Sequence, residues 1–204
     1  MANNNEQKNL LEKELELNQF EVETIDKPDE EIFRKIINLE NSCIPESWRF
    51  SEDFYEQELS KPENIKIILR TKDRDKKLIG LVLLEPYNNN LINEMLEDDP
   101  ELKIVEGSAY YMITIEIDPD YQGMGLSSTL FDAMESEMIV RGSNKLILHA
   151  RVSNGFSNSL EKRYGDRIIN KRRIDRWKYY KPEEPCDYME IQLEKKYTTD
   201  TPTL

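Results

Sequence analysis

Histidine and cysteine are scarce in this chain, which has one histidine and two cysteines among 204 residues. Cys43 and Cys186 lie far apart and show no metal-ligand spacing, so the sequence predicts reduced thiols and no metal site. The single histidine, His149, excludes a histidine-rich metal centre. The longest apolar run, residues 78–84, is far shorter than the roughly 20 residues that a membrane-spanning helix needs.

Basic residues are outnumbered by acidic ones, 28 to 41, so the formal net charge is −13. A chain this acidic repels nucleic acid and anionic membranes, so neither is expected as a partner. The charge favours cationic partners, although it is equally consistent with a role in solubility alone. The polar start, Met1–Glu6, lacks the basic and apolar pattern of a signal peptide, which predicts a cytoplasmic location.

The pattern of apolar residues predicts a mixed α/β fold. Strands are expected over 20–25, 65–70, 78–85, 110–118, 146–152, 167–174 and 187–193. Helices are expected from a cap near Asp26 or Lys27, and over 51–59, 125–140 and 155–164. The folded domain is assigned to 20–195, between an N-terminal arm (1–19) and a flexible tail (196–204). A polar insertion is expected at 87–107, with one helical turn around Ile92–Leu96.

The segment most informative about function is Asp118–Ser127, where a strand ends, a short loop follows and a helix begins at once. In this arrangement several backbone N–H groups and the helix dipole face one point, which suits a pyrophosphate. Gly123 and Gly125 permit a close backbone approach. The loop is neither a Walker loop nor a complete dinucleotide fingerprint, so an ordinary strand-to-helix turn is the alternative.

Two motifs in this region resemble those of the GNAT acetyltransferase superfamily. Gln122-x-x-Gly125-x-Ser127 resembles its acetyl-CoA loop, with serine in place of the usual glycine or alanine, and Asn154 followed by Gly165 resembles its second motif. The resemblance spans about residues 20–195 and is strongest over 110–166. It implies one domain with a mixed, mostly antiparallel sheet of about six or seven strands and about four flanking helices. It also implies acetyl-CoA as cosubstrate, held by Ile115, Glu116, Ile117, Gln122, Gly123, Met124, Gly125, Leu126, Ser127, Asn154, Ser159 and Glu161.

Within this superfamily, short matches resemble the protein N-terminal acetyltransferases. They are Leu148–Asn154, Trp177–Tyr180 with Asp187–Met189, and Ile44–Trp48. This resemblance implies that the acceptor is the α-amine of a protein or peptide, contacted by Pro45, Glu46, Tyr179 and Tyr180. A small-amine acetyltransferase and an acyl-CoA-binding module without turnover stay open as alternatives, as do a monomer and a homodimer.

The resemblance further implies direct attack of the amine on the thioester in a ternary complex, which requires a base. His149 is the first candidate because its unperturbed pKa of about 6.5 suits proton removal near neutrality. Tyr111 and Glu116 are the second and third candidates. The family commonly places a tyrosine, as the acid that protonates the thiolate, where this chain has Glu161. Glutamate is a poor proton donor unless its pKa is raised, so the acid is left unassigned.

Overall fold

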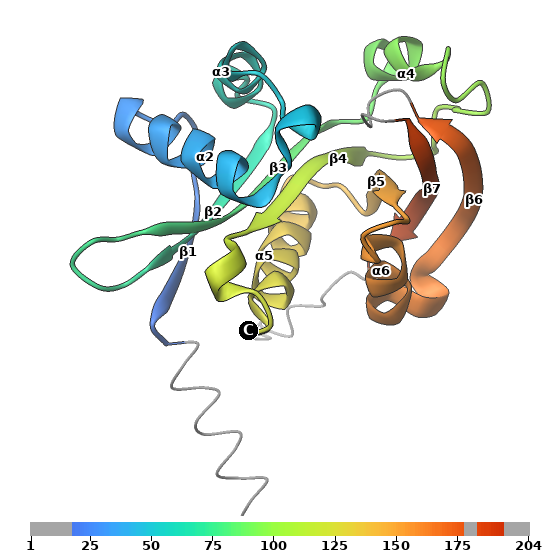
Figure 1. Cartoon of the computed structure of the whole chain (residues 1–204). Coiled ribbons are helices and arrows are strands. Elements are labelled where there is room, and N and C mark those ends of the chain that lie inside the picture. The colour runs from blue at the N-terminus through green and yellow to red at the C-terminus, as the bar shows by residue number, and fades with distance from the viewer. Residues whose placement is uncertain (1–17, 178–182, 194–204) are drawn as a thin grey trace, which may run out of the picture. The chain divides into compact units, whose positions relative to one another are not determined.

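The computed structural model describes residues 18–177 and 183–193. It has an α/β fold with a seven-stranded sheet in the order β1-β2-β3-β4-β5-β7-β6 (Figure 1). The strands are Phe20–Thr24 (β1), Ile65–Thr71 (β2), Leu78–Pro86 (β3), Ala109–Ile117 (β4), Lys145–Arg151 (β5), Ile168–Trp177 (β6) and Glu184–Gln192 (β7). The helices are Glu30–Cys43 (α2), Glu52–Ser60 (α3), Asn89–Met95 (α4), Leu126–Val140 (α5) and Phe156–Tyr164 (α6).

The sheet is mixed, as the sequence predicted. β1 and β2, β2 and β3, β5 and β7, and β6 and β7 pair antiparallel, whereas β4 and β5 run parallel over Ala109–Tyr111 and Lys145–Ile147. The chain forms two compact units. The first is Met1–Glu85 with Ile113–Met134, and the second is Pro86–Met112 with Glu135–Leu204.

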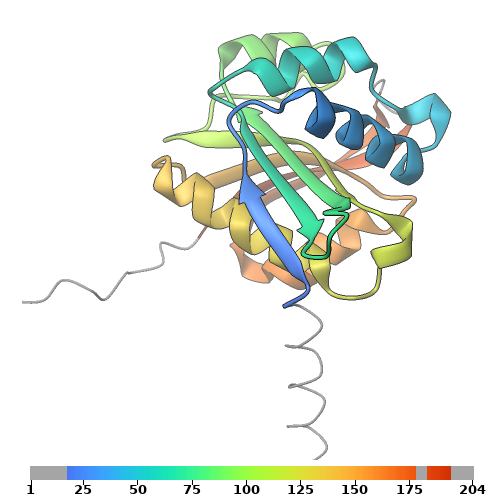
Figure 2. The ribbon, with the colours of Figure 1, turned by 90° about the vertical axis from the view of Figure 1, so that its left-hand side faces the viewer.

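In the first unit, α2 and α3 cover one face of β2 and β3 (Figure 2). The core on this face includes Ile36 and Leu39 from α2, Tyr55 and Leu59 from α3, and Ile68, Leu81 and Leu83 from the strands. On the opposite face, a Cβ added to Gly80 would meet the side chain of Leu130 in α5 at 3.1 Å. Glycine at this position therefore lets α5 pack closely against β3.

In the second unit, the centre is the antiparallel set β5-β7-β6. Leu146, Leu148 and Ala150 of β5 are fully buried or nearly so, and Met189 and Ile191 of β7 are fully buried beside them. Segment 87–107 belongs to this unit and contributes four buried apolar side chains, Leu91, Ile92, Met95 and Leu102. The predicted single turn around Ile92–Leu96 is corrected to a longer helix, α4, because Asn88 caps its start by accepting from the N–H groups of Asn90 and Leu91.

The predicted cap of the first helix was wrong by two or three residues. Asp29 is the N-cap of α2, and its side chain accepts a hydrogen bond from the N–H of Ile32 at 2.8 Å. Asp26 and Lys27 precede Pro28, whereas an N-cap side chain must reach the N–H two or three positions ahead within the helix. α5 is followed by a glycine in the left-handed region. Gly142 has φ +76°, and Ser143 N–H donates to Met138 O at 2.9 Å.

Candidate functional site

Two of the predicted catalytic residues, Tyr111 and His149, are hydrogen-bonded to each other in the second unit. The Tyr111 hydroxyl lies 3.0 Å from His149 Nδ1. The two side chains come from adjacent parallel strands, because Tyr111 of β4 pairs with Ile147 of β5, two residues before His149. The sequence suggested them as alternative bases, whereas the structure makes them neighbours in one hydrogen-bonded series.

Asp99 completes this series from the opposite side of the imidazole. Its Oδ2 lies 3.2 Å from His149 Nε2, and the same oxygen accepts a hydrogen bond from Arg172 Nη2. An ionised carboxylate is acceptor-only, so Nε2 carries the N–H and Nδ1 presents a lone pair to the Tyr111 hydroxyl. The arrangement can pass a proton from Tyr111 to His149, and Asp99 stabilises the charge that the imidazole gains.

The imidazole of His149 is enclosed, with 1% of its side chain exposed. It stacks on Trp177 with ring centroids 3.9 Å apart and lies 5.5 Å from the ring of Tyr188. Burial lowers the pKa of His149, and the hydrogen bond to Asp99 opposes this without reversing it. His149 is therefore neutral and able to accept a proton at neutral pH.

Asp99 is ionised despite its burial. Burial raises the pKa of its carboxyl, but the hydrogen bonds from His149 and Arg172 outweigh this, and the net pKa is lowered. The Arg172 guanidinium also lies over the ring of Tyr188, 4.4 Å from its centroid. These contacts hold the carboxylate in place. Asp99 was missed by sequence reasoning because it lies in the acidic stretch 97–99 of a segment read as an insertion, and nothing in its spacing relates it to His149.

In the first unit, the loop predicted to hold a pyrophosphate has the expected strand-loop-helix form. Gly123 and Gly125 have φ of +81° and +80°, a backbone region that favours glycine. The loop is exposed at Gln122, Gly123, Gly125 and Ser127, whereas Leu126 is buried and anchors the start of α5. Gln122 Nε2 donates to Ile117 O at 3.0 Å, which fastens the loop to the end of β4.

The second predicted cofactor segment, in the second unit, surrounds the start of α6. Asn154 Oδ1 accepts from the N–H of Phe156 at 3.0 Å, and Ser159 Oγ donates to Gly155 O at 3.1 Å. Both residues are exposed. Glu161 forms an ion pair with Lys171 of β6.

Glu116, the third candidate base, is in the first unit and is 2% exposed. Its Oε1 lies 2.9 Å from the hydroxyl of Tyr55 on α3 and accepts from Thr114 Oγ1 at 3.0 Å. The same tyrosine hydroxyl lies 2.8 Å from Glu40 Oε2. Burial and the neighbouring charge of Glu40 raise the pKa of Glu116 well above its ordinary value, which disfavours the ionised form that a base needs.

Of the predicted acceptor-binding residues, Pro45 and Glu46 are exposed in the 3-10 turn Glu46–Trp48 that follows α2. Arg49 stabilises this turn, because its Nε donates to Ile44 O at 2.7 Å and its Nη2 donates to Asn41 O at 2.8 Å. Tyr179 and Tyr180 lie outside the described residues. Ile115 and Ile117 are half-buried on β4, and Met124 is half-buried in the loop.

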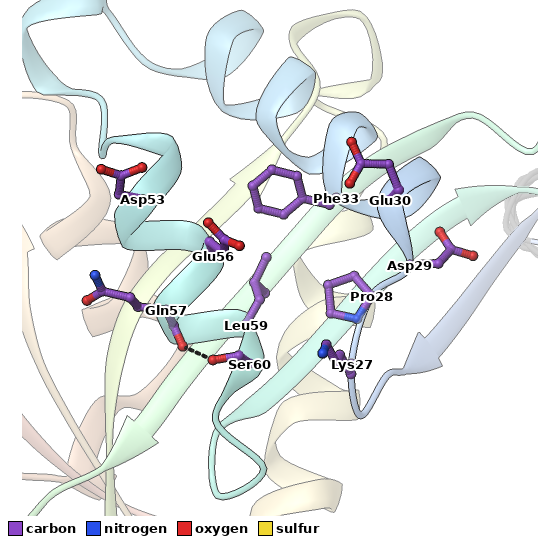
Figure 3. A pocket seen from close by; sticks show the side chains of 10 residues that line it. All are labelled: Lys27, Pro28, Asp29, Glu30, Phe33, Asp53, Glu56, Gln57, Leu59 and Ser60. Carbon is purple, nitrogen blue, oxygen red and sulfur yellow. Dashed lines mark hydrogen bonds between the residues drawn. The ribbon is translucent and has the colours of Figure 1, made fainter.

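A pocket of about 640 Å³ lies between the start of α2 and helix α3 (Figure 3). Its lining includes the carboxylates of Asp29, Glu30, Asp53 and Glu56 around the apolar side chains of Phe33 and Leu59. It includes none of the predicted site residues. Within 18–177 and 183–193, no three His, Cys, Asp or Glu side chains are grouped to hold a metal ion. Over the same ranges, no helix has the length and apolar character needed to cross a membrane.

Comparison with known proteins identifies relatives of this chain. The family model described as "Acetyltransferase (GNAT) family" matches residues 33–165. A Yersinia pestis (strain Pestoides F) protein described as an acetyltransferase is 30% identical over 116 residues, which cover 45% of this chain and 80% of that protein.

Solved structures share the fold at low sequence identity. A chain of the NatC complex bound to Gag peptide and CoA has a TM-score of 0.65 and 18% identity, covering 86% of this chain and 99% of its own. A spermidine N-acetyltransferase chimera from Vibrio cholerae and hSSAT has a TM-score of 0.59 and 18% identity, covering 85% and 95%. At these identities the likeness concerns the fold alone.

Proposed function

Because this chain belongs to the GNAT family of acetyltransferases and is an N-acetyltransferase, we propose that it transfers an acetyl group from acetyl-CoA to the α-amine of a protein or peptide N-terminus. The observation that carries the proposal is the hydrogen-bonded series from Tyr111 through His149 to Asp99. A neutral, buried imidazole that accepts from a tyrosine hydroxyl and donates to a carboxylate is suited to removing a proton from an amine.

Each member of the series has a separate task. The Tyr111 hydroxyl accepts a proton from the attacking amine while it gives its own proton to His149 Nδ1. The resulting imidazolium is stabilised by Asp99, and Arg172 keeps that carboxylate in position. Trp177 and Tyr188 exclude water from the imidazole, which strengthens these electrostatic interactions. Tyr111 is thus proposed to touch the acceptor, and His149 to act behind it.

The loop 122–127 fits a pyrophosphate in this proposal. Two glycines with positive φ leave the backbone N–H groups accessible, and a helix of 15 residues begins directly afterwards, so its dipole favours an anion there. A Cβ added to Gly123 would meet nothing within 4 Å, so the loop surface is open on that side. When bound, acetyl-CoA supplies the acetyl group as a thioester. Asn154 and Ser159 are proposed to contact it from the start of α6.

The choice of an α-amine rests on the resemblance of residues 148–154 and 44–48 to the protein N-terminal acetyltransferases. The NatC complex, which was solved bound to a peptide, agrees with this choice. A small-amine acceptor is the alternative, and the spermidine N-acetyltransferase chimera is the neighbour that favours it. An acyl-CoA-binding module without turnover is a weaker alternative, because it gives no role to a buried proton-transfer series.

The acceptor can be identified by competition. The purified protein is incubated with acetyl-CoA, pooled N-terminal peptides and pooled polyamines and amino acids at equal concentrations, and mass spectrometry identifies the acetylated products. We expect acetylated peptide α-amines. Acetylation of small amines alone would instead establish the second acceptor class. No acetylation, with acetyl-CoA still raising the melting temperature, would leave only the binding module.

A matched pair of variants tests the proton-transfer role. Tyr111→Phe is expected to lower kcat/KM by about 10²- to 10⁴-fold, the usual contribution of general acid–base catalysis. Tyr110→Phe is the control, because Tyr110 is the adjacent residue of β4 and is equally buried, with 8% exposed. Similar losses in both variants would show that the effect is structural and would remove Tyr111 from the mechanism.

A further inference from the structure

Two buried glutamates meet on one tyrosine hydroxyl in the first unit, whereas the Tyr111–His149 series belongs to the second unit. The Tyr55 hydroxyl lies 2.8 Å from Glu40 Oε2 and 2.9 Å from Glu116 Oε1. Tyr55 is fully buried, and each glutamate is 2% exposed. A hydroxyl has one proton to donate, so it can satisfy one carboxylate and not two. If both glutamates were ionised, one of them would face an oxygen lone pair without a proton between them.

The groups around this cluster do not compensate a second negative charge. The neighbours that act most strongly on Glu116 are Glu40, Tyr55 and Thr114, none of which is cationic. From α2 the cluster also faces the thiol of Cys43, whose pKa burial raises to about 12, and from the end of β4 the carboxylate of Asp118. Asp118 is itself paired with Lys77. Glu40 lies in the last turn of α2, which has no basic residue and where the helix dipole disfavours a further negative charge.

We propose that Glu40, Tyr55 and Glu116 share a single extra proton, carried by Glu116, and that this proton fixes residues 44–50 in place. The hydrogen bonds assign the proton to Glu116. Both oxygens of Glu40 have a donor, because Oε1 accepts from the N–H of Phe50 and Oε2 from Tyr55. Glu116 Oε2 has no hydrogen-bond partner among the described residues. Glu116 therefore donates to the Tyr55 oxygen, and Tyr55 donates to the Glu40 carboxylate.

The connection from this proton to residues 44–50 runs through Glu40. Glu40 Oε1 accepts from Phe50 N–H at 2.9 Å. The ring of Phe50 stacks on Phe54, with centroids 4.3 Å apart, and meets Tyr55 edge-on at 6.1 Å. Loss of the proton places two carboxylates on one hydroxyl. Their repulsion is relieved when Glu40 moves away, which breaks its bond to Phe50. Glu116 is then a positioning residue for the turn that carries Pro45 and Glu46. Only the link from this turn to acceptor binding rests on the proposed function.

Infrared difference spectroscopy tests the proton directly, without any acceptor. A protonated carboxylic acid has a carbonyl stretching band that a carboxylate lacks. We expect this band in the full chain at neutral pH, its disappearance as the pH is raised, and its absence in Glu116→Gln. Glu58→Gln is the matched control, because Glu58 is a buried glutamate of α3 that Lys61 and Asn64 hold as a carboxylate. No band at neutral pH, or a band that persists in Glu116→Gln, would overturn the shared proton.

The pH dependence of turnover tests the positioning role. As the infrared band disappears, the KM for the acceptor is expected to rise about tenfold with little change in kcat, within the usual range for coupled sites. Glu116→Gln keeps a neutral donor to Tyr55, so its KM is expected to stay constant over the same pH range. A KM that rises equally in both proteins would refute the positioning role. Loss of kcat in a folded Glu116→Gln would make Glu116 the base and refute the proposal. If no acceptor is turned over, the infrared result still decides the shared proton, so the two failures are distinguishable.

Discussion

Replacing Asp99 with asparagine should separate the negative charge beside His149 from the orientation of its imidazole. Asp99 accepts from Nε2, and this leaves the Nδ1 lone pair facing Tyr111. The same Asp99 oxygen accepts from His149 Nε2 and from Arg172 Nη2, so the asparagine keeps its amide oxygen there and Nε2 keeps its proton. What Asp99→Asn removes is the negative charge that stabilises the imidazolium formed when Nδ1 takes the Tyr111 proton. We expect kcat/KM to fall by about 10²- to 10⁴-fold, or about 3–5 kcal/mol of transition-state stabilisation.

The assay must also account for stability. Removing one partner of a buried ion pair can cost about 3–5 kcal/mol, and the low end applies here because Arg172 keeps part of its solvent contact and its position over Tyr188. Asp187→Asn is the control, since Asp187 is equally buried and paired with Arg173 but is no part of the series. Melting temperatures and acetyl-CoA affinities are compared for both variants. If Asp99→Asn loses stability and retains kcat/KM, Asp99 does not stabilise a charged imidazole and the proposed mechanism is wrong.

Three further outcomes are expected. Gly123→Ala should weaken acetyl-CoA binding measured by calorimetry, because alanine at φ +81° costs about 1–2 kcal/mol. Gly142→Ala is the control: its φ is also positive, but it lies outside the loop, so it should lower only the melting temperature. Glu116 has a raised pKa, so the wild-type protein should lose stability, relative to Glu116→Gln, as the pH rises above about 4.3; parallel pH–stability curves would contradict this. Glu161→Gln should leave kcat/KM unchanged and cost at most about 1 kcal/mol, because its pair with Lys171 is partly exposed; a large loss of kcat would identify Glu161 as the missing acid.

Local patterns were enough to predict the element order and the loop before α5. Alternating apolar residues mark the strands. The sequence explained Gly123 and Gly125 by a close backbone approach, and their positive φ supplies a different reason for glycine there. The helix over 155–164 was also predicted to within a residue. Each of these features depends on neighbours in the sequence, which a single chain displays directly.

The partners of the candidate catalytic residues could not be predicted in the same way. Asp99 meets His149 across 50 residues, and Tyr55 meets Glu116 across 61. No periodicity relates such positions, because long-range packing brings them together. The sequence thus named Glu116 as a possible base from its strand alone, whereas burial and the neighbouring Glu40 raise its pKa. It also offered His149 and Tyr111 as alternatives for one role, although they are in contact.

The stacking of His149 on Trp177 provides an optical probe of the reaction. A protonated imidazole quenches the fluorescence of an indole in contact with it, and these two rings are 3.9 Å apart. The chain has one other tryptophan, Trp48, which can be replaced by phenylalanine so that Trp177 is the sole emitter. Rapid mixing of such a protein with acetyl-CoA and an acceptor would then follow, in real time and without a label, when the histidine gains its proton and when it loses it.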